Sequence, residues 1–248
     1  MENDKISAKA KMLIAVAALG YFVDVYDLIL FSVVRNPSLM SLGLKGDELL
    51  NQGLNLMNVQ MGGMLLGGIL WGIYGDKKGR KSVLFGSILL YSAANALNGL
   101  VTDLNTYALL RFIAGIGLAG ELGAGITLVS ELLPKNKRGI GTSLVAGIGL
   151  FGAVFAYFTY QFTDDWRLCY KIGGGLGIGL LLLRVSVAES GMFNEVKDKV
   201  KFYDRYELSM AMAMVFAMAM AMTRPLVMES RAFRVMLSQP PLMSTKGV

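Results

Sequence analysis

Histidine is absent from the 248-residue sequence, and Cys169 is its only cysteine. The first absence excludes a histidine-ligated metal centre and a catalytic triad with a histidine base. The second excludes an intrachain disulfide and a CxxC zinc site. Charged residues are also scarce, at 17% of the chain against about 25% in ordinary globular proteins. We therefore expect no metal, no cofactor and no enzymatic activity.

Apolar residues and glycine take the place of these missing types. Hydrophobic residues make up 54% of the chain, and glycine occurs 30 times. A helix that crosses a bilayer core needs about 20 mostly apolar residues. The sequence therefore predicts an all-α, polytopic membrane protein built as a six-helix bundle. The six stretches that qualify are roughly 12–34, 53–74, 82–101, 107–129, 141–160 and 168–187.

Lysine and arginine alternate from one connection to the next. They gather in the N-terminal tail, in the second and fourth connections and after the sixth stretch, and are few in the other connections. Cytoplasmic loops of membrane proteins carry an excess of these residues. An even number of spans also places both ends of the bundle on one side. The pattern predicts a multi-pass protein of the plasma (inner) membrane with a cytoplasmic N-terminus.

Three parts of the chain differ in composition. Residues 1–11 form a basic cytoplasmic tail, and residues 12–197 contain the six stretches. Residues 198–248 include an alternation of methionine and alanine at 210–222, whose apolar run is short for a membrane span. We interpret this last part as an atypical Met/Ala-rich tail that results from a truncated or frame-shifted reading frame.

Charged side chains inside the predicted spans are costly and mark functional sites by default. Asp24 and Asp27 in the first stretch are three residues apart, hence on one helical face. From the helix rise, Asp27 lies roughly 6 Å and Arg111 of the fourth stretch roughly 10 Å to the outer side of the midplane. The two can meet if their helices are neighbours. We take Asp27, Arg111 and Asp24 as candidate proton-coupling residues.

Two interpretations of the Asp27–Arg111 pair stay open. In the first, a conformational change separates the pair, and the desolvated carboxylate then takes up a proton because its cation has left. In the second, the pair is permanent and only fixes the register of two helices.

Uncharged polar side chains also interrupt the apolar stretches. Asn58 and Gln60 lie in the second stretch, and such amides either line a wet cavity or hold helices together. Together with Tyr26 and Glu121 they are our candidates for a substrate cavity. Glu121 and Glu131 are separated by roughly 15 Å of helix rise, which is too far for shared acid–base chemistry.

Short motifs then make the pattern specific. The connection between the second and third stretches, residues 72–81, reads GIYGDKKGRK. It resembles the signature loop GxxxD(R/K)xGR(R/K) of the major facilitator superfamily. Arg111 with the glycines that follow it resembles the RxxxGxGxxxG motif of that superfamily. Residues 131–139, ELLPKNKRG, resemble its ExxPxxxRG motif.

Further motifs are similar to those of the sugar-porter-like and metabolite:proton symporter branches. These are Asp165-Trp166-Arg167, the segment AESGMF at 188–193, which lacks both prolines of the family pattern, and Tyr26-Asp27. The resemblance covers about residues 12–197. It implies a fold like one six-helix half of a facilitator.

The resemblance also implies a function and a set of roles. The expected function is secondary active transport, a proton-coupled symport of a small organic solute (organic acid, amino acid, betaine or sugar) by alternating access. Gly120-Glu121 favours the metabolite and organic-ion branches over the sugar branch. Asp27 is then the proton site and Arg111 its partner. The cytoplasmic gate is expected to contain Gly75, Asp76, Gly79, Arg80, Glu131 and Arg138.

Members of the family have two six-helix halves, with the substrate site between them, and only the first is recognisable here. We weigh a truncated or frame-shifted reading frame, a half-carrier that pairs with a second chain, and a non-transporting remnant. The expected partners are a small solute, a proton, the lipid bilayer, and either the missing C-terminal half or a second copy, with no nucleic acid. The alternative function is a membrane scaffold that does not transport.

Overall fold

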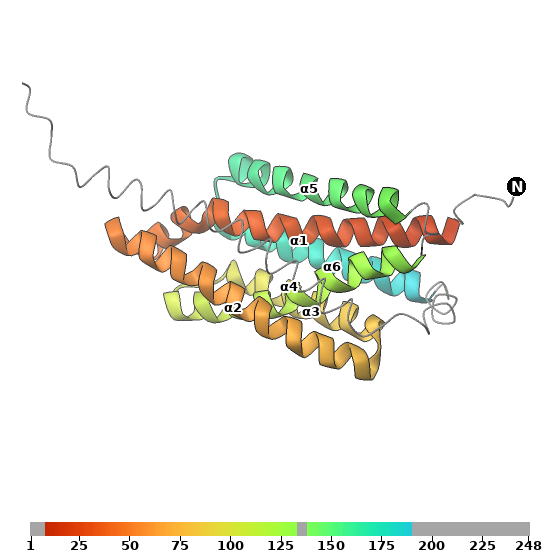
Figure 1. Ribbon diagram of the computed structural model, residues 1–248. Coiled ribbons are helices and arrows are strands. Elements are labelled where there is room, and N and C mark those ends of the chain that lie inside the picture. The colour runs from red at the N-terminus through yellow and green to blue at the C-terminus, as the bar shows by residue number, and fades with distance from the viewer. Residues whose placement is uncertain (1–7, 133–137, 190–248) are drawn as a thin grey trace, which may run out of the picture.

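The computed structural model describes residues 8–132 and 138–189, which form six α-helices joined by short connections (Figure 1). This confirms the predicted all-α six-helix bundle, and each predicted boundary shifts by at most seven residues. The Met/Ala-rich tail lies outside the described residues. The helices are α1 (Ala8–Ser41), α2 (Gly46–Lys78), α3 (Arg80–Asn98), α4 (Leu104–Leu132), α5 (Arg138–Thr163) and α6 (Trp166–Glu189).

Segments of α1, α2, α5 and α6 are long and apolar enough to cross a membrane, and α3 contains a shorter apolar segment, Ser82–Asn98. With 34 residues, α1 is about 51 Å long, which exceeds the roughly 30 Å of a hydrocarbon core. Its predicted end at residue 34 was too early. The helix continues past Arg35 and Pro37 to Ser41.

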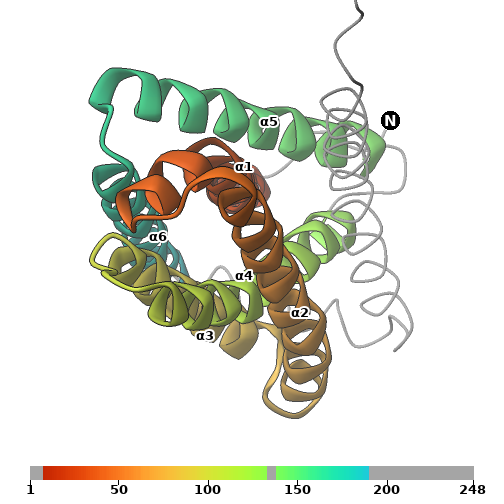
Figure 2. The ribbon, with the colours of Figure 1, turned by 90° about the vertical axis from the view of Figure 1, so that its left-hand side faces the viewer.

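The packing of the helices is symmetric: the set of contacting pairs stays the same when the first three helices are exchanged with the last three. α1 packs mainly on α5 and α2 mainly on α4, while α3 packs on α4 and α6, and α1 also contacts α6. Exchanging α1, α2 and α3 with α4, α5 and α6 maps the α3–α6 pair onto itself and each of the other pairs onto another pair of the set. Figure 2 shows α5 and α1 together on one side of the bundle, and α3 and α4 on the other.

Glycines allow the helix backbones to approach closely in two of these pairs. A Cβ atom at Gly67 of α2 would lie 2.5 Å from the backbone oxygen of Ile116 on α4. Gly152 of α5 faces the backbone oxygen of Phe22 on α1 in the same manner. Close packing of small residues holds helices together where lipid provides no hydrophobic driving force between them.

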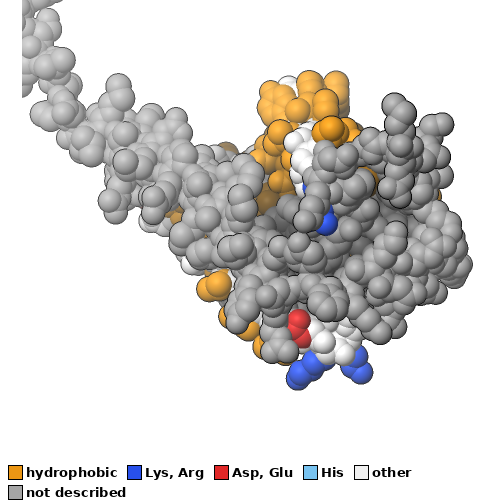
Figure 3. Space-filling view, turned by 45° about the vertical axis from the view of Figure 1, so that its right-hand side comes forward, with side chains coloured by type: hydrophobic (Ala, Val, Ile, Leu, Met, Phe, Trp, Pro, Cys, Tyr) orange, Lys and Arg blue, Asp and Glu red, His pale blue; other side chains and the backbone are white. Residues whose placement is uncertain are grey.

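Large apolar side chains remain exposed on the outer faces of α2 and α5. On α5, Phe151 is 67% and Phe162 82% exposed. Hydrophobic side chains gather in the upper part of Figure 3, at the height where α5 lies in Figure 1. Charged side chains lie at its lower edge, at the height of the turn between α2 and α3. Such apolar surfaces suit lipid or another membrane segment.

The main apolar core lies between α1, α4 and α6. Aromatic side chains make up much of it, including Tyr26, Phe31, Tyr107, Trp166 and Tyr170. Several of these rings pack edge to face, such as Tyr107 against Tyr170 with centroids 6.1 Å apart. This core encloses the buried polar residues described next.

Candidate functional site

Asp27 and Arg111 form an ion pair at the centre of the bundle. Asp27 lies on α1 and Arg111 on α4, and both side chains are fully buried. The Arg111 Nη2 and Asp27 Oδ1 atoms are 3.5 Å apart. Helices α1 and α4 are in contact, so the condition under which the two side chains were expected to meet is fulfilled.

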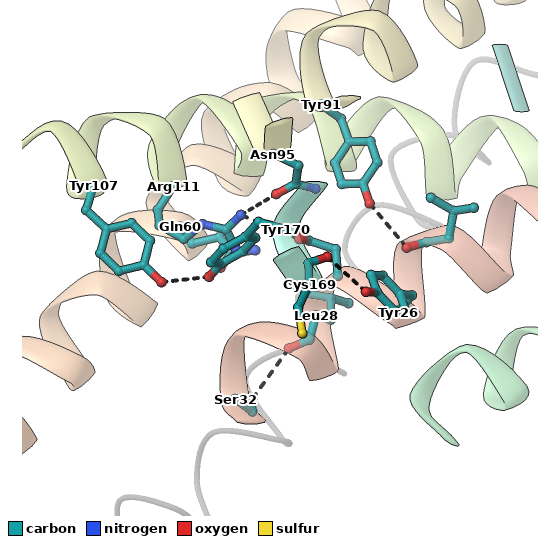
Figure 4. A network of polar contacts seen from close by, with 12 residues as sticks. Tyr26, Leu28, Ser32, Gln60, Tyr91, Asn95, Tyr107, Arg111, Cys169 and Tyr170 are labelled. Carbon is teal, nitrogen blue, oxygen red and sulfur yellow. Dashed lines mark hydrogen bonds and ion pairs between the residues drawn. The ribbon is translucent and has the colours of Figure 1, made fainter. Parts of the chain in front are cut away.

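Arg111 has further partners on three other helices (Figure 4). Its Nη2 donates a hydrogen bond to Asn95 Oδ1 of α3 at 2.5 Å, and its Nη1 donates to Gln60 Oε1 of α2 at 3.4 Å. The guanidinium also lies over two aromatic rings, at 4.9 Å from the centroid of Tyr170 and 5.3 Å from that of Phe31. These contacts hold the cation in place without Asp27.

Several polar atoms around this cation have no hydrogen-bond partner. They are Asp27 Oδ2, Gln60 Nε2, Asn95 Nδ2 and Arg111 Nε. Buried polar groups are normally satisfied, so a cluster of exceptions needs a reason. The three donors among them can still bind a water molecule or a polar solute group, and the carboxylate oxygen can accept a proton or a hydrogen bond.

A chain of hydroxyl groups extends from this site. The hydroxyls of Tyr170 and Tyr107 are 2.7 Å apart, and Tyr107 in turn lies 3.2 Å from Ser38 Oγ. All three residues are fully buried. Our sequence reasoning missed Tyr107 and Tyr170. Tyr107 was open to prediction, because it lies four residues before Arg111 and so shares its helical face.

The four residues predicted to line a substrate cavity do not come together. Gln60 contacts Arg111, whereas Asn58, about 200° further round the same helix, is exposed. Tyr26 is fully buried and donates a hydrogen bond to the backbone oxygen of Cys169 at 3.0 Å. Glu121 lies in a different cluster. A cavity role for these residues stays a prediction.

Glu121 of α4 pairs with Arg184 of α6, an interaction that sequence reasoning missed. Arg184 Nη1 donates to Glu121 Oε2 at 2.7 Å, and Nη2 contacts Oε1. Both side chains are buried. The signal was present, since Arg184 follows four leucines inside the sixth apolar stretch, where a charge is costly.

The predicted gate residues lie at the turn between α2 and α3 and in the region between α4 and α5. Asp76 is exposed. Gly79 joins α2 and α3 at a φ of 86°, which favours glycine, and its N–H donates to the backbone oxygen of Gly75 at 2.9 Å. Arg138 is the first residue of α5. The side chains of Arg80 and Glu131 lie outside the described part of the structure. The gate therefore stays a prediction.

Comparisons with known proteins agree with this architecture. The sequence profile of the Major Facilitator Superfamily matches residues 17–245, beyond residue 197 where the motif resemblance ends. The sialic acid transporter NanX of Escherichia coli (strain K12) is 30% identical over 188 residues, which cover 75% of this chain and 45% of that protein. The niacin transporter NiaP of Acinetobacter baylyi is 29% identical over 217 residues, covering 83% and 48%. The chain thus spans about half the length of these curated relatives.

Solved structures show the same fold. The proton:xylose symporter XylE, bound to 6-bromo-6-deoxy-D-glucose, matches with a TM-score of 0.66 at 17% identity, over 87% of this chain and 54% of that one. The related sequences are transporters and not enzymes. The profile match covers most of the chain, and the helices are long and apolar. The chain is a multi-pass membrane protein and belongs to the major facilitator superfamily.

Proposed function

We propose that the chain forms the proton-coupling unit of a secondary active transporter that carries a small organic acid together with a proton. The observation that supports this most is the buried Asp27–Arg111 pair, in which Asp27 Oδ2 has no hydrogen-bond partner. A proton can be added to that oxygen without first breaking a hydrogen bond. A fully satisfied pair would instead favour the permanent, structural interpretation.

The contacts of Arg111 suggest how protonation follows movement. Asn95, Gln60 and the Tyr170 ring hold the guanidinium on the side away from α1. When α1 shifts relative to α4, Arg111 stays with these partners, and Asp27 becomes a buried carboxylate without a counter-ion. Such a group takes up a proton. When the helices return, Arg111 again stabilises the ionised form, and the proton leaves on the side of the membrane that is then open.

The solute class follows from the same cation. Arginine binds carboxylates through two parallel hydrogen bonds. Once Asp27 is protonated, Arg111 is a cation without a counter-ion, and a solute carboxylate can take the vacated place. Solute binding and protonation would then depend on each other. Niacin and sialic acid, the solutes named for two relatives, are both carboxylic acids.

A complete transport path needs a second six-helix unit, which is either the C-terminal half of a longer protein or a second copy of this chain. Substrate sites in such carriers lie between two repeats near the bilayer midplane. The apolar faces of α2 and α5, exposed in this structure, offer a surface for that unit. We place the assembly in the inner membrane with the N-terminus in the cytoplasm, from the distribution of lysine and arginine.

The test is uptake of labelled niacin and sialic acid in proteoliposomes that contain the chain together with its second six-helix unit, with an imposed pH gradient. We expect gradient-driven accumulation of at least one acid, abolished in Asp27→Asn. Exchange of solute across the membrane without a gradient should survive in that variant, because asparagine mimics the neutral acid. Asp103→Asn, which changes an exposed carboxylate next to α4, is the matched control and should retain accumulation.

Two outcomes would contradict the proposal at different levels. Gradient-driven accumulation by Asp27→Asn would remove Asp27 from the coupling step. A folded assembly of the chain with its second unit that neither binds nor moves any organic acid would favour the alternative, a membrane scaffold without transport. In that case Asp27→Asn and Arg111→Ala should change stability alone.

A further inference from the structure

A second buried charge cluster lies apart from the Asp27–Arg111 pair. Arg184 of α6 binds both carboxylate oxygens of Glu121 on α4, and its Nη1 also contacts the backbone oxygen of Leu84 on α3 at 3.5 Å. The two side chains are 2% and 4% exposed. This cluster joins three helices inside the bundle.

The backbone of α1 closes directly over this cluster. A Cβ atom at Gly20 would lie 2.6 Å from Arg184 Nη2 and 2.6 Å from Glu121 Oε1. Gly20 therefore leaves the space that the ion pair occupies. Asp24 follows Gly20 by one helical turn and lies on the same face of α1.

Asp24 is the unexplained member of this region. It is 2% exposed, and its Oδ2 atom has no hydrogen-bond partner. Its carboxyl group interacts electrostatically with Glu121, Arg184 and Asp27. Arg184 already contacts both oxygens of Glu121. The cation near Asp24 is therefore paired with a different carboxylate.

The charges of the two clusters do not balance. The described buried groups include three carboxyls, Asp24, Asp27 and Glu121, and two arginines, Arg111 and Arg184. The ion pairs Arg111–Asp27 and Arg184–Glu121 use both arginines, and Asp24 has no arginine of its own. An unpaired carboxylate in such surroundings is neutralised by a proton rather than kept charged.

No other basic group of the packed helices faces Asp24 among the described side chains. On α1 itself it interacts with Tyr21 and Asp27, and on α3 with Tyr91. The charged residues of α2 are exposed near its two ends.

On α5, the titratable side chains are those of Arg138, Tyr157 and Tyr160. Arg138 is the first residue of that helix, Tyr157 is 53% exposed, and Tyr160 interacts with Asp164. Arg184 is thus the cation that Asp24 and Glu121 share.

We propose that Asp24, Glu121 and Arg184 form a second proton site, in which Arg184 pairs with one carboxylate at a time and the other carboxyl holds a proton. In the described arrangement Arg184 pairs with Glu121, so the proposal assigns the proton to Asp24. If α1 moves so that Asp24 reaches Arg184, Asp24 gives its proton to a water molecule and Glu121 takes a proton from that water, so the number of protons in the cluster stays the same. The proton thereby changes helix, from α1 to α4, as the arginine changes partner.

This inference extends the proposed function, because a second site adds a proton that moves with the conformational change. Its test does not depend on transport. Infrared spectroscopy of the purified full chain in lipid nanodiscs detects the carbonyl stretch of a protonated carboxylic acid. At neutral pH we expect one such band in the wild type. It should shift on labelling with isotope-substituted aspartate, which requires no variant.

Variants show which residue holds the proton and whether Arg184 can change its carboxylate partner. Asp24→Asn should lose the band, and the matched variant Asp27→Asn should keep it. Glu121→Gln frees Arg184 for Asp24, so the band should disappear there as well, since Asp24 then ionises. Absence of the band from the wild type, its persistence in Asp24→Asn or its persistence in Glu121→Gln would each overturn the proposal. Failure of acid uptake with the band present would overturn only the proposed transport function.

Discussion

The hydroxyl groups of Tyr107 on α4 and Tyr170 on α6 lie 2.7 Å apart beside Arg111, and neither side chain is exposed. The two hydroxyls form a hydrogen bond with each other inside an apolar core. Removal of one hydroxyl takes the nearest partner from the other, which is desolvated; Tyr170 then has no other hydrogen bond of this kind among the described residues, while Tyr107 keeps the longer contact with Ser38 Oγ. Removal of both leaves no tyrosine hydroxyl without its partner.

A double-mutant cycle at this pair should therefore be strongly non-additive. We expect Tyr170→Phe to lower the free energy of unfolding by about 1–3 kcal/mol, and Tyr107→Phe to act similarly. The double variant should lose clearly less than the two single losses combined. Denaturant titration of the purified chain in mild detergent measures all four free energies. Simple additivity would mean that the two hydroxyls do not interact in solution.

Removal of the Arg111 side chain should destabilise the bundle through Asp27. Arg111→Ala leaves a buried carboxylate without a counter-ion, and breaking a buried pair in this way costs about 3–5 kcal/mol. The double variant Arg111→Ala/Asp27→Asn should recover much of the loss, because no unpaired charge remains. Thermal unfolding of both variants at neutral pH checks this. Equal stabilities would show that Asp27 is not what makes the loss of Arg111 costly.

Arg111→Lys is a sharper version of the same test. Lysine has no planar fork of donors, so it cannot bond Asp27, Asn95 and Gln60 together or lie flat over the Tyr170 ring. We expect lysine to keep part of the stability and to lose acid uptake. Uptake at the wild-type rate by Arg111→Lys would mean that charge alone, without the guanidinium geometry, is sufficient.

The contact between α2 and α4 predicts a clear difference between two glycines of one helix. A Cβ at Gly67 meets the backbone of α4, whereas one at Gly72 has open space around it. Gly67→Ala should destabilise the chain by about 1–3 kcal/mol through overpacking. Gly72→Ala should be neutral, or stabilise by up to about 1 kcal/mol because alanine favours helix more than glycine does. Similar thermal midpoints for the two variants would contradict the close approach of α2 and α4.

The predicted orientation can be checked by cysteine labelling of intact cells. The natural thiol is buried and is removed first with Cys169→Ser. Lys77→Cys, at the turn between α2 and α3, should react with an impermeant maleimide only after the cells are opened. Thr102→Cys, at the following turn, should react in intact cells. The reverse pattern would place the N-terminus outside.

The position of a residue along a helix axis can be predicted well from this sequence, but the neighbouring helix that its side chain faces cannot. The constant rise of a helix placed Asp27 and Arg111 at matching depth, and their contact followed. Rotation about the axis depends on which neighbours a helix packs against, and no single-chain pattern states that. For this reason the sequence grouped Asn58 with Gln60, although Asn58 is exposed, and did not indicate that Glu121 pairs with Arg184. The burial of Tyr26 against the backbone of Cys169 likewise depends on how α1 and α6 meet.

The exchange pattern of the helix pairs has a consequence for how the chain is made. The main partner of α1 is α5, and a main partner of α4 is α2. The first three helices and the last three helices therefore each need the other set for their main contacts. During synthesis α1 enters the membrane long before α5 exists, and Asp27 stays without Arg111 until α4 has followed. Contacts so distant in sequence form late in folding. We therefore expect a chain cut after α3 not to reach this packing, because α1 and α2 would lack their main partners α5 and α4.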